Sequence, residues 1–169
     1  MILKGSEEEK LLYAIIYEDI KKVKSILKRS NKNKKILDLN EKNEDGYYPL
    51  SEAIFNNNVE IVKLLIEYAN QHQIILNLNE KDNVGNYPLL EAIDNNNVEI
   101  VKLLINYALK HQIILIYNKN YYHLKNNIKI KNLLQYYEKE IENIKKVIKN
   151  ELYKCINKYY INKLYILYE

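Results

Sequence analysis

The amino-acid sequence predicts an all-α repeat solenoid, in which helix-turn-helix units form a stack that C-terminal helices close. The first observation is repetition: the 34 residues from Gly46 to Asn79 recur 39 positions later with 26 identities. The second is periodicity, because apolar residues within each copy follow the 3.6-residue spacing of amphipathic helices. The third is that no glycine or proline occurs from Ile128 onwards, which favours uninterrupted helix.

The internal repetition sets the domain organisation. Residues 46–84 form one unit and residues 85–123 form the next. The same offset reaches back into a degenerate first unit, residues 7–45, where Ala14 and Ile15 fall on Ala53 and Ile54. We therefore expect repeats over residues 1–123 and a helical capping segment over residues 124–169.

Each unit is expected to fold as a turn, a short helix, a tight turn, a longer helix and a return loop. Gly46 suits a turn that needs positive φ, and Pro49 suits the first position of a helix. The short helix ends at the asparagines of residues 56–58, since asparagine tolerates the left-handed conformation. The longer helix runs from Val59 to about His72, and the first helix of the chain opens with a capping box formed by Ser6 and a glutamate three residues later.

The C-terminal segment carries one long apolar stripe with helical spacing. Its members are Ile130, Leu134, Tyr137, Ile141, Ile144, Ile148, Leu152 and Cys155. One or two helices that pack this stripe on the third unit and close the stack are the first interpretation. The alternatives are a coiled-coil seam through which the protein dimerises, and a loose basic tail. We expect a monomer, with the coiled-coil dimer left open.

This repeat resembles the ankyrin repeat. The resemblance covers about residues 7–123 and rests on matches to the family pattern of a tight turn, a Pro-Leu helix start and a second helix with Glu-Ile-Val and Leu-Leu. The matching residues are Asp45-Gly46-Tyr47-Tyr48-Pro49-Leu50, Ala53 and Val59-Glu60-Ile61-Val62-Lys63-Leu64-Leu65. The resemblance implies a stack with a concave face, on which turn tips and short helices bind protein partners.

The chain departs from the ankyrin pattern at several positions. Tyr48 and Ser51 replace the threonine and histidine of the family, so the hydrogen bonds of those side chains are expected to be missing. Asn57 stands where the family has a glycine between its helices. Ala69 replaces the glycine that ends the second helix, which fits a helix that continues past it and a unit of 39 residues instead of the usual ~33.

Motifs for catalysis or for a cofactor are missing from the sequence. Three glycines leave no glycine-rich phosphate loop, and one cysteine leaves neither a disulfide framework nor a cysteine-rich zinc site. The histidines, His72, His111 and His123, lack matching carboxylates beside them and are expected to be polar residues at helix ends. Cys155 is expected to pack as a small hydrophobic residue. We expect no enzyme activity, no catalytic residue, no metal and no cofactor.

Glutamates recur at fixed positions of the units. Glu52 and Glu91 occupy one position, and Glu60 and Glu99 occupy another. We expect solvated surface side chains at both positions, not acid/base pairs.

The positions that differ between the two strong units are the candidate partner-binding residues. Residues that must stack are held alike in both copies, whereas residues on an exposed face are free to vary. The candidates, at family positions that lie on the concave face and the turn tips, are Glu44, Asp45, Tyr47, Phe55, Asn83, Val84, Asn86 and Asp94. Phe55 is the single phenylalanine of the chain, and an exposed aromatic side chain suits an interface anchor.

The sequence thus predicts a protein-interaction module or scaffold that binds a protein partner of unknown identity. The alternative is a nucleic-acid or polyanion binder that uses the acid-free stretch Lys21–Lys35 and the basic C-terminal helices. Residues 118–169 carry 11 lysines and 5 acidic residues, but lysine and glutamate alternate there, which makes nucleic acid the weaker expectation. The start of the chain lacks the apolar core of a signal peptide, and no apolar run is long enough to span a membrane, so an intracellular location, in cytoplasm or nucleus, is expected.

Overall fold

A computed structural model of the chain describes residues 5–43, 46–82, 85–117 and 127–167, with the side chains described up to residue 156. The described residues form helices and contain no strand. The helices are α1 (Glu7–Ile16), α2 (Ile20–Asn33), α3 (Pro49–Phe55), α4 (Val59–His72), α5 (Pro88–Asp94), α6 (Val98–Lys110) and α7 (Ile128–Leu167). The chain divides into two compact units, Met1–Leu133 and Leu134–Glu169, and each is described by itself.

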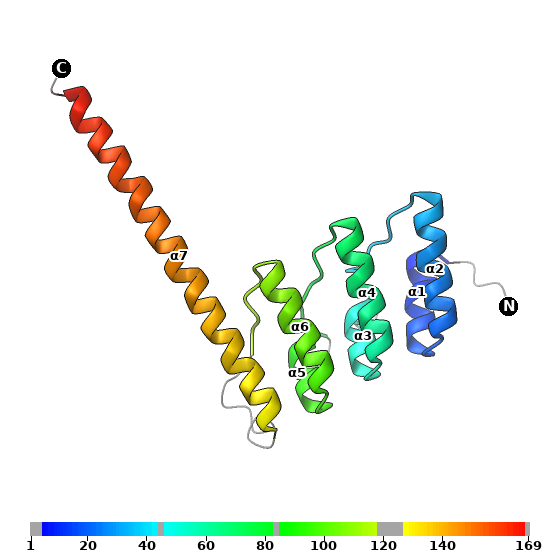
Figure 1. Cartoon of the computed structure of the whole chain (residues 1–169). Coiled ribbons are helices and arrows are strands. Elements are labelled where there is room, and N and C mark those ends of the chain that lie inside the picture. The colour runs from blue at the N-terminus through cyan, green and yellow to red at the C-terminus, as the bar shows by residue number, and fades with distance from the viewer. Residues whose placement is uncertain (1–4, 44–45, 83–84, 118–126, 168–169) are drawn as a thin grey trace. The chain divides into compact units, whose positions relative to one another are not determined.

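The first compact unit is a stack of three helix pairs (Figure 1). Helices α1, α3 and α5 pack on one another and form one layer, and α2, α4 and α6 form the second layer. Each pair corresponds to one 39-residue unit of the sequence. The expected all-α repeat solenoid is therefore confirmed, and the second helix of the middle pair ends at His72 as predicted.

Residues with positive φ make the predicted turns. Gly46 and Gly85 have φ of 80° and 97° before the short helices. Asn57 and Asn96 adopt the left-handed conformation, with φ of 56° and 53°, and separate the two helices of each pair. Asparagine adopts this conformation at lower cost than most side chains, which explains why it can replace the glycine of the family pattern.

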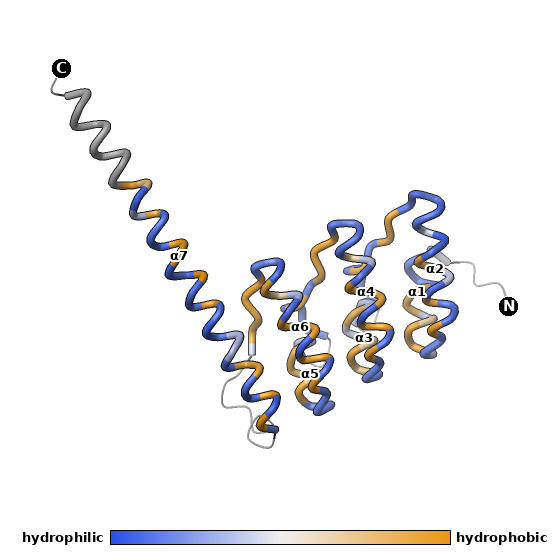
Figure 2. The backbone as a smooth tube through the Cα atoms, viewed as in Figure 1, coloured by the Kyte–Doolittle hydropathy of each residue, from blue (hydrophilic) through white to orange (hydrophobic). Residues whose placement is uncertain are grey.

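The core lies between the two helix layers and under the return loops, where the apolar segments of neighbouring units face one another (Figure 2). In the middle unit, Leu50 and Ile54 of α3 and Ile61, Val62 and Leu65 of α4 are all fully buried. The apolar stripes read from the sequence are therefore the surfaces along which the units stack.

Tyrosines of the second helices tie neighbouring units together. The Tyr68 hydroxyl accepts a hydrogen bond from the Leu37 N–H at 3.1 Å and lies 2.5 Å from the Ser30 hydroxyl oxygen. One unit later, the Tyr107 hydroxyl accepts from the Leu76 N–H at 3.2 Å and donates to the Ile74 carbonyl at 2.8 Å. These bonds satisfy backbone groups of the return loops that stacking removes from water.

Asparagines of the tight turns form a second series of joints. Asn56 Nδ2 donates to the Ile15 carbonyl at 3.2 Å, and Asn95 Nδ2 donates to the Ile54 carbonyl at 2.8 Å. Each bond links the end of a short helix to the short helix of the preceding unit. The asparagine runs therefore hold the layer of short helices together in addition to making turns.

Two hydrogen bonds between Tyr48 and Ser51 form at the start of α3, where the family pattern has threonine and histidine. The Tyr48 N–H donates to Ser51 Oγ at 2.9 Å, and Ser51 Oγ donates back to the Tyr48 carbonyl at 2.9 Å. Tyr48 is fully buried, and its hydroxyl donates to the Asn77 carbonyl. Burial raises the pKa of the Tyr48 hydroxyl, and the charges of Glu80 and Asp82 raise it further.

The beginning of α7 repeats the second helix of the third pair, which the sequence analysis missed. Residues 127–137 match residues 97–107 at five of 11 positions, at an offset of 30. Asn127 Oδ1 accepts from the Lys129 and Ile130 N–H groups, as Asn97 Oδ1 does from Glu99 and Ile100. Asn127 Nδ2 also donates to Asn96 Oδ1 at 2.5 Å, as Asn97 Nδ2 does to Asn57 Oδ1 at 2.6 Å. The start of α7 thus joins the third pair as α6 joins the second.

Helix α7 is one continuous helix, where the sequence left one or two open. The apolar stripe along α7 is buried near the start of the helix and exposed further along it. Its first four members, from Ile130 to Ile141, are buried, Ile144 is half-buried, and Ile148, Leu152 and Cys155 are exposed. The expectation that Cys155 packs as a small hydrophobic residue is therefore wrong, because no apolar surface of the described residues covers the stripe at that point.

Candidate functional site

An exposed aromatic pair lies where the sequence places the partner-binding residues. Phe55 is the last residue of α3 and is 51% exposed. Tyr47 precedes the same helix and is half-buried. Their ring centroids are 5.6 Å apart and the planes are inclined by 50°. The predicted exposure of Phe55 is confirmed, and Tyr47 supports it from one side.

The surface around this pair changes from apolar to acidic along the layer of short helices. We call it the first-helix face and define it by eight residues at the ends of the first helices and in the turns before α3 and α5: Tyr13, Ile16, Tyr17, Tyr47, Phe55, Asn86, Glu91 and Asp94. At the position of Phe55, the first unit carries Ile16 and the third carries Asp94. Tyr13 and Tyr17, at the end of α1, are also exposed. Sequence reasoning missed Tyr13 and Ile16 of α1 and Tyr17 directly after it, although Ile16 falls on Phe55 at the repeat offset.

The third unit makes the acidic end of the first-helix face. Asn86 lies in the turn before α5; its N–H donates to Asp82 Oδ1 at 2.8 Å, and its Nδ2 donates to Glu91 Oε2 at 3.3 Å. Burial raises the pKa of Glu91, and the charges of Asp94 and Asp82 raise it further, against a lowering by the Asn86 hydrogen bond. Asp94 and Asp82 thus place further negative charge beside Glu91 at this end of the face.

The remaining candidate residues lie at the turn tips. Glu44, Asp45, Asn83 and Val84 fall outside the described residues. Of the eight candidates, the structure describes Tyr47, Phe55, Asn86 and Asp94, and all four belong to the first-helix face.

The expectation that Glu52 is a solvated surface residue is wrong. Glu52 is buried in α3, and its Oε1 accepts from Asn56 Nδ2 at 3.3 Å. The same Asn56 Nδ2 also donates to the Ile15 carbonyl of the preceding unit, so Glu52 lies where two units meet. The other position does lie at the surface: Glu60 pairs with Lys24 at 2.6 Å, and Glu99 pairs with Lys63.

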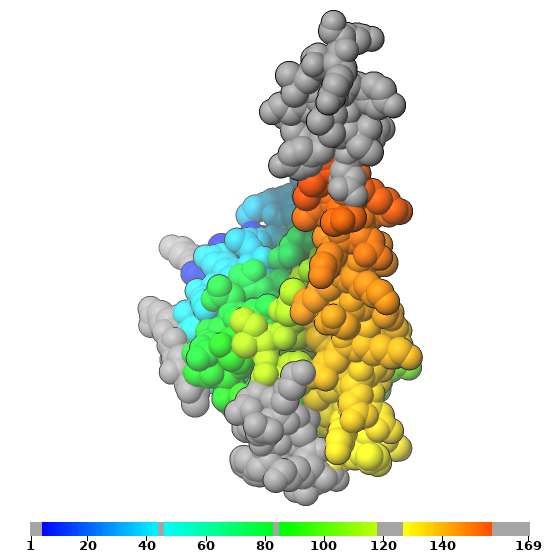
Figure 3. All heavy atoms as spheres, turned by 90° about the vertical axis from the view of Figure 1, so that its left-hand side faces the viewer, coloured from blue at the N-terminus to red at the C-terminus, as the bar shows by residue number. Residues whose placement is uncertain are grey.

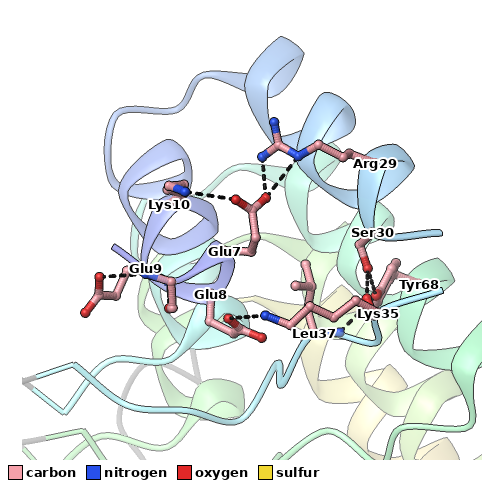
Figure 4. A network of polar contacts seen from close by, with 10 residues as sticks. Glu7, Glu8, Glu9, Lys10, Arg29, Ser30, Lys35, Leu37 and Tyr68 are labelled. Atoms are coloured by element: carbon pink, nitrogen blue, oxygen red, sulfur yellow. Dashed lines mark hydrogen bonds and ion pairs between the residues drawn. The ribbon is translucent and has the colours of Figure 1, made fainter. Parts of the chain in front are cut away.

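The basic stretch Lys21–Lys35 is partly neutralised by acids from elsewhere in the chain. Arg29 pairs with Glu7 of α1, and Lys35 lies 3.9 Å from Glu8 (Figure 4). Hydrogen bonds from Lys10 and Arg29 lower the pKa of Glu7. With the pair between Lys24 and Glu60, three of the eight basic residues of this stretch face a carboxylate.

His72 and His111 lie at helix ends and contact the neighbouring unit. His72 Nε2 lies 2.6 Å from Asn31 Oδ1, and His111 Nε2 lies 2.9 Å from Asn70 Oδ1. Burial lowers the pKa of His111, and Lys110 lowers it further. His123 falls outside the described residues. Among the residues with a description, no three His, Cys, Asp or Glu side chains gather in a group able to hold a metal ion.

The helices described here are too short or too polar to cross a lipid bilayer. No curated protein matches the chain in a sequence comparison. A family model for ankyrin repeats, in three copies, does match residues 11–114. This match runs over the three stacked helix pairs from Leu11 in α1 onwards, and it includes the glycine turns and the Pro-Leu helix starts of the second and third pairs. The chain therefore belongs to the ankyrin repeat family.

Proposed function

We propose that this chain binds a protein partner through its first-helix face, with Phe55 and Tyr47 as the anchor and without catalysis. The proposal is supported by the family, because ankyrin repeats are generally protein–protein interaction modules. The observation that carries the proposal is the exposure of Phe55 in a stack that buries most of its other large apolar helix residues. An exposed aromatic side chain held against a second ring loses little conformational entropy on binding. We place this activity inside the cell, where ankyrin repeat domains mostly occur.

The gradient along the first-helix face supports a directional mode of binding. Ile16, Tyr17 and Phe55 offer apolar contact over the first two units, and Glu91 and Asp94 offer negative charge over the third. A partner that presents an apolar anchor at one end and basic residues at the other matches both properties. Charge complementarity of this kind fixes the orientation of a complex more than its affinity.

The test is Phe55→Ala, measured against a partner isolated by pull-down with the intact chain from the source cell. We expect the substitution to weaken binding by about 2 kcal/mol or more, which is roughly 30-fold, because it removes a central aromatic anchor. The far-UV circular dichroism should not change, since Phe55 is exposed. Isothermal titration calorimetry gives the affinity.

Ile75→Ala is the matched control for this experiment. Ile75 is 52% exposed, as Phe55 is, but it lies in the return loop after α4. The Ile75→Ala substitution should change the affinity for the partner by less than about twofold, as expected of surface substitutions outside an interface. Equal losses from both variants would reject the first-helix face as the site.

Nucleic-acid binding gives a separate prediction. Three basic residues of Lys21–Lys35 form ion pairs with acidic residues outside the stretch, and these pairs reduce the positive charge that the stretch can offer to phosphates. We expect no binding to single- or double-stranded oligonucleotides tighter than about 10 μM at about 150 mM salt, because contacts with phosphate weaken steeply with salt. Fluorescence anisotropy over a salt series measures it.

Tight nucleic-acid binding would contradict this prediction. Sub-micromolar binding at that salt concentration, lost when Lys28, Arg29, Lys34 and Lys35 are changed to glutamate, would replace the protein-interaction proposal by a nucleic-acid one.

A further inference from the structure

The turn before α3 is held by the side chain of Asn43. The Tyr47 N–H donates to Asn43 Oδ1 at 2.8 Å. Two backbone bonds close the same turn: the Asn43 N–H donates to the Tyr47 carbonyl at 2.8 Å, and the Gly46 N–H donates to the Asn43 carbonyl at 3.0 Å. An asparagine side chain that accepts from a nearby backbone N–H is a common way to fix a turn. Here it fixes the backbone of Tyr47, which forms the proposed anchor together with Phe55.

The third unit contains a second copy of this arrangement. Asp82 stands at the position of Asn43, and its Oδ1 accepts from the Asn86 N–H at 2.8 Å. The Asp82 N–H donates to the Asn86 carbonyl at 3.1 Å, and the Gly85 N–H donates to the Asp82 carbonyl at 3.1 Å. Asparagine in one unit and aspartate in the next thus make the same bonds. The turn therefore requires a side-chain oxygen at this position and does not require a charge.

The residue that is held in this way lies against the short helix of its own unit. In the second unit, the centroid of the Tyr47 ring lies 5.6 Å from that of Phe55 in α3. In the third unit, Asn86 Nδ2 donates to Glu91 Oε2 of α5 at 3.3 Å. Figure 3 shows α3 in cyan next to α5 in green at the surface of the molecule. The two turns thus direct the side chain of the held residue onto the first-helix face.

We propose that Asn43 is a positioning residue for partner binding, because its side chain holds the backbone of Tyr47 where the Tyr47 ring supports Phe55. The direction of a ring is set by the Cα–Cβ bond and two side-chain torsions, so a fixed backbone limits the positions that the ring can take. An anchor that is already in place loses less conformational entropy on binding. The effect on binding rests on the proposed function, whereas the position of the ring can be measured without a partner.

The first experiment follows the two rings by NMR in the absence of a partner. Phe55 is the single phenylalanine of the chain, so phenylalanine-selective labelling reports on its ring alone. We expect nuclear Overhauser effects between the Phe55 and Tyr47 rings in the intact chain. Asn43→Ala should reduce their intensity by about half or more, since loss of one hydrogen bond shifts a local equilibrium by such a factor. Asn43→Asp should preserve them, because Asp82 makes the same bond in the third unit.

Asn79→Ala is the matched control for the ring measurement. The Asn79 side chain also bonds to backbone, since it donates to the Ile114 carbonyl at 2.7 Å and accepts from the Ile116 N–H at 2.9 Å, but it lies in the return loop after α4. This variant should leave the contact between the rings unchanged. Far-UV circular dichroism should show that Asn43→Ala keeps the fold, because two backbone bonds still close its turn. An unchanged ring contact in Asn43→Ala, or an equal loss in Asn79→Ala, would overturn the proposal.

The second experiment measures the affinity for the partner isolated with the intact chain. Asn43→Ala should weaken binding about threefold to tenfold, which is the range that one hydrogen bond contributes, and Asn43→Asp should stay within about twofold of the intact chain. In a chain that already carries Tyr47→Ala, the further change Asn43→Ala should have no added effect, because no ring is left to position. Equal weakening in both backgrounds would mean that Asn43 does not act through Tyr47 and would overturn the proposal.

The two experiments separate this inference from the proposed function. Phe55→Ala without an effect on binding would reject the first-helix face as the site. The ring measurement would still decide whether Asn43 holds Tyr47 against Phe55, because it uses the chain alone.

Discussion

Leu65→Ala is expected to lower the free energy of unfolding by about 2–5 kcal/mol. Leu65 is fully buried in α4, the second helix of the middle pair, and α4 packs against α2 and α6 of the units on both sides. Truncation to alanine removes three carbon atoms from this site, and the stacked helices on either side limit how far the cavity closes. Urea unfolding followed by circular dichroism gives the change.

Leu64→Ala provides the control, because Leu64 is the adjacent residue of the same helix but is only half-buried. The chemical change and the helix propensity are the same, so the two variants differ in burial alone. We expect a loss of less than about 1 kcal/mol at Leu64. Similar losses at the two positions would mean that the helix faces the stack through a different stripe.

Removal of residues 124–169 should have the largest effect on folding, with loss of the cooperative transition or aggregation. The repeats cannot bury their apolar faces singly, and the last one needs a closing helix. Asn127 and Ile130 provide the first part of that closure within the same compact unit as the repeats. Ile130 is 1% exposed, and Ile100, Val101 and Leu104 of α6 are fully buried. We expect the shortened chain to expose them.

A milder truncation separates closure from the rest of α7. A chain that ends at residue 143 keeps the segment that repeats α6 and loses the exposed part of the stripe. It should melt cooperatively by circular dichroism and stay monomeric in sedimentation equilibrium. A chain of residues 1–123 that is soluble and melts as sharply as the full chain would contradict the closing role of α7.

The repeat arithmetic was sufficient to predict the fold. Positions with a strong local requirement, such as Gly46, Pro49 and Asn57, each have one structural solution, and the 39-residue offset carries that solution to the next unit. The exposure of Phe55 could be predicted for the same reason, because the residue lies outside the stripe that must stack. Local rules thus predict both the turns and the side of each helix that faces the core.

Contacts between units could not be predicted in this way. The ion pair between Lys24 and Glu60 and the burial of Glu52 depend on which side chains stacking brings together, and that is not a local property. The similarity of residues 127–137 to residues 97–107 was not found from the sequence, because its offset is 30 residues and the repeat offset is 39. Cys155 lies on a stripe whose residues are buried at one end and exposed at the other, and periodicity does not say where along a helix the burial ends.

The hydrogen bonds between asparagine side chains and helix carbonyls of the preceding unit affect how the chain could gain or lose whole repeats in evolution. A 39-residue unit contains both groups that a joint needs: an asparagine that donates, as Asn56 and Asn95 do, and a helix carbonyl that accepts, as Ile15 and Ile54 do. Insertion of one further copy of residues 46–84 would create a junction in which each donor again meets an acceptor. Gene duplication in whole units therefore needs no compensating substitutions, and the 26 identities shared by two adjacent copies fit growth by that route.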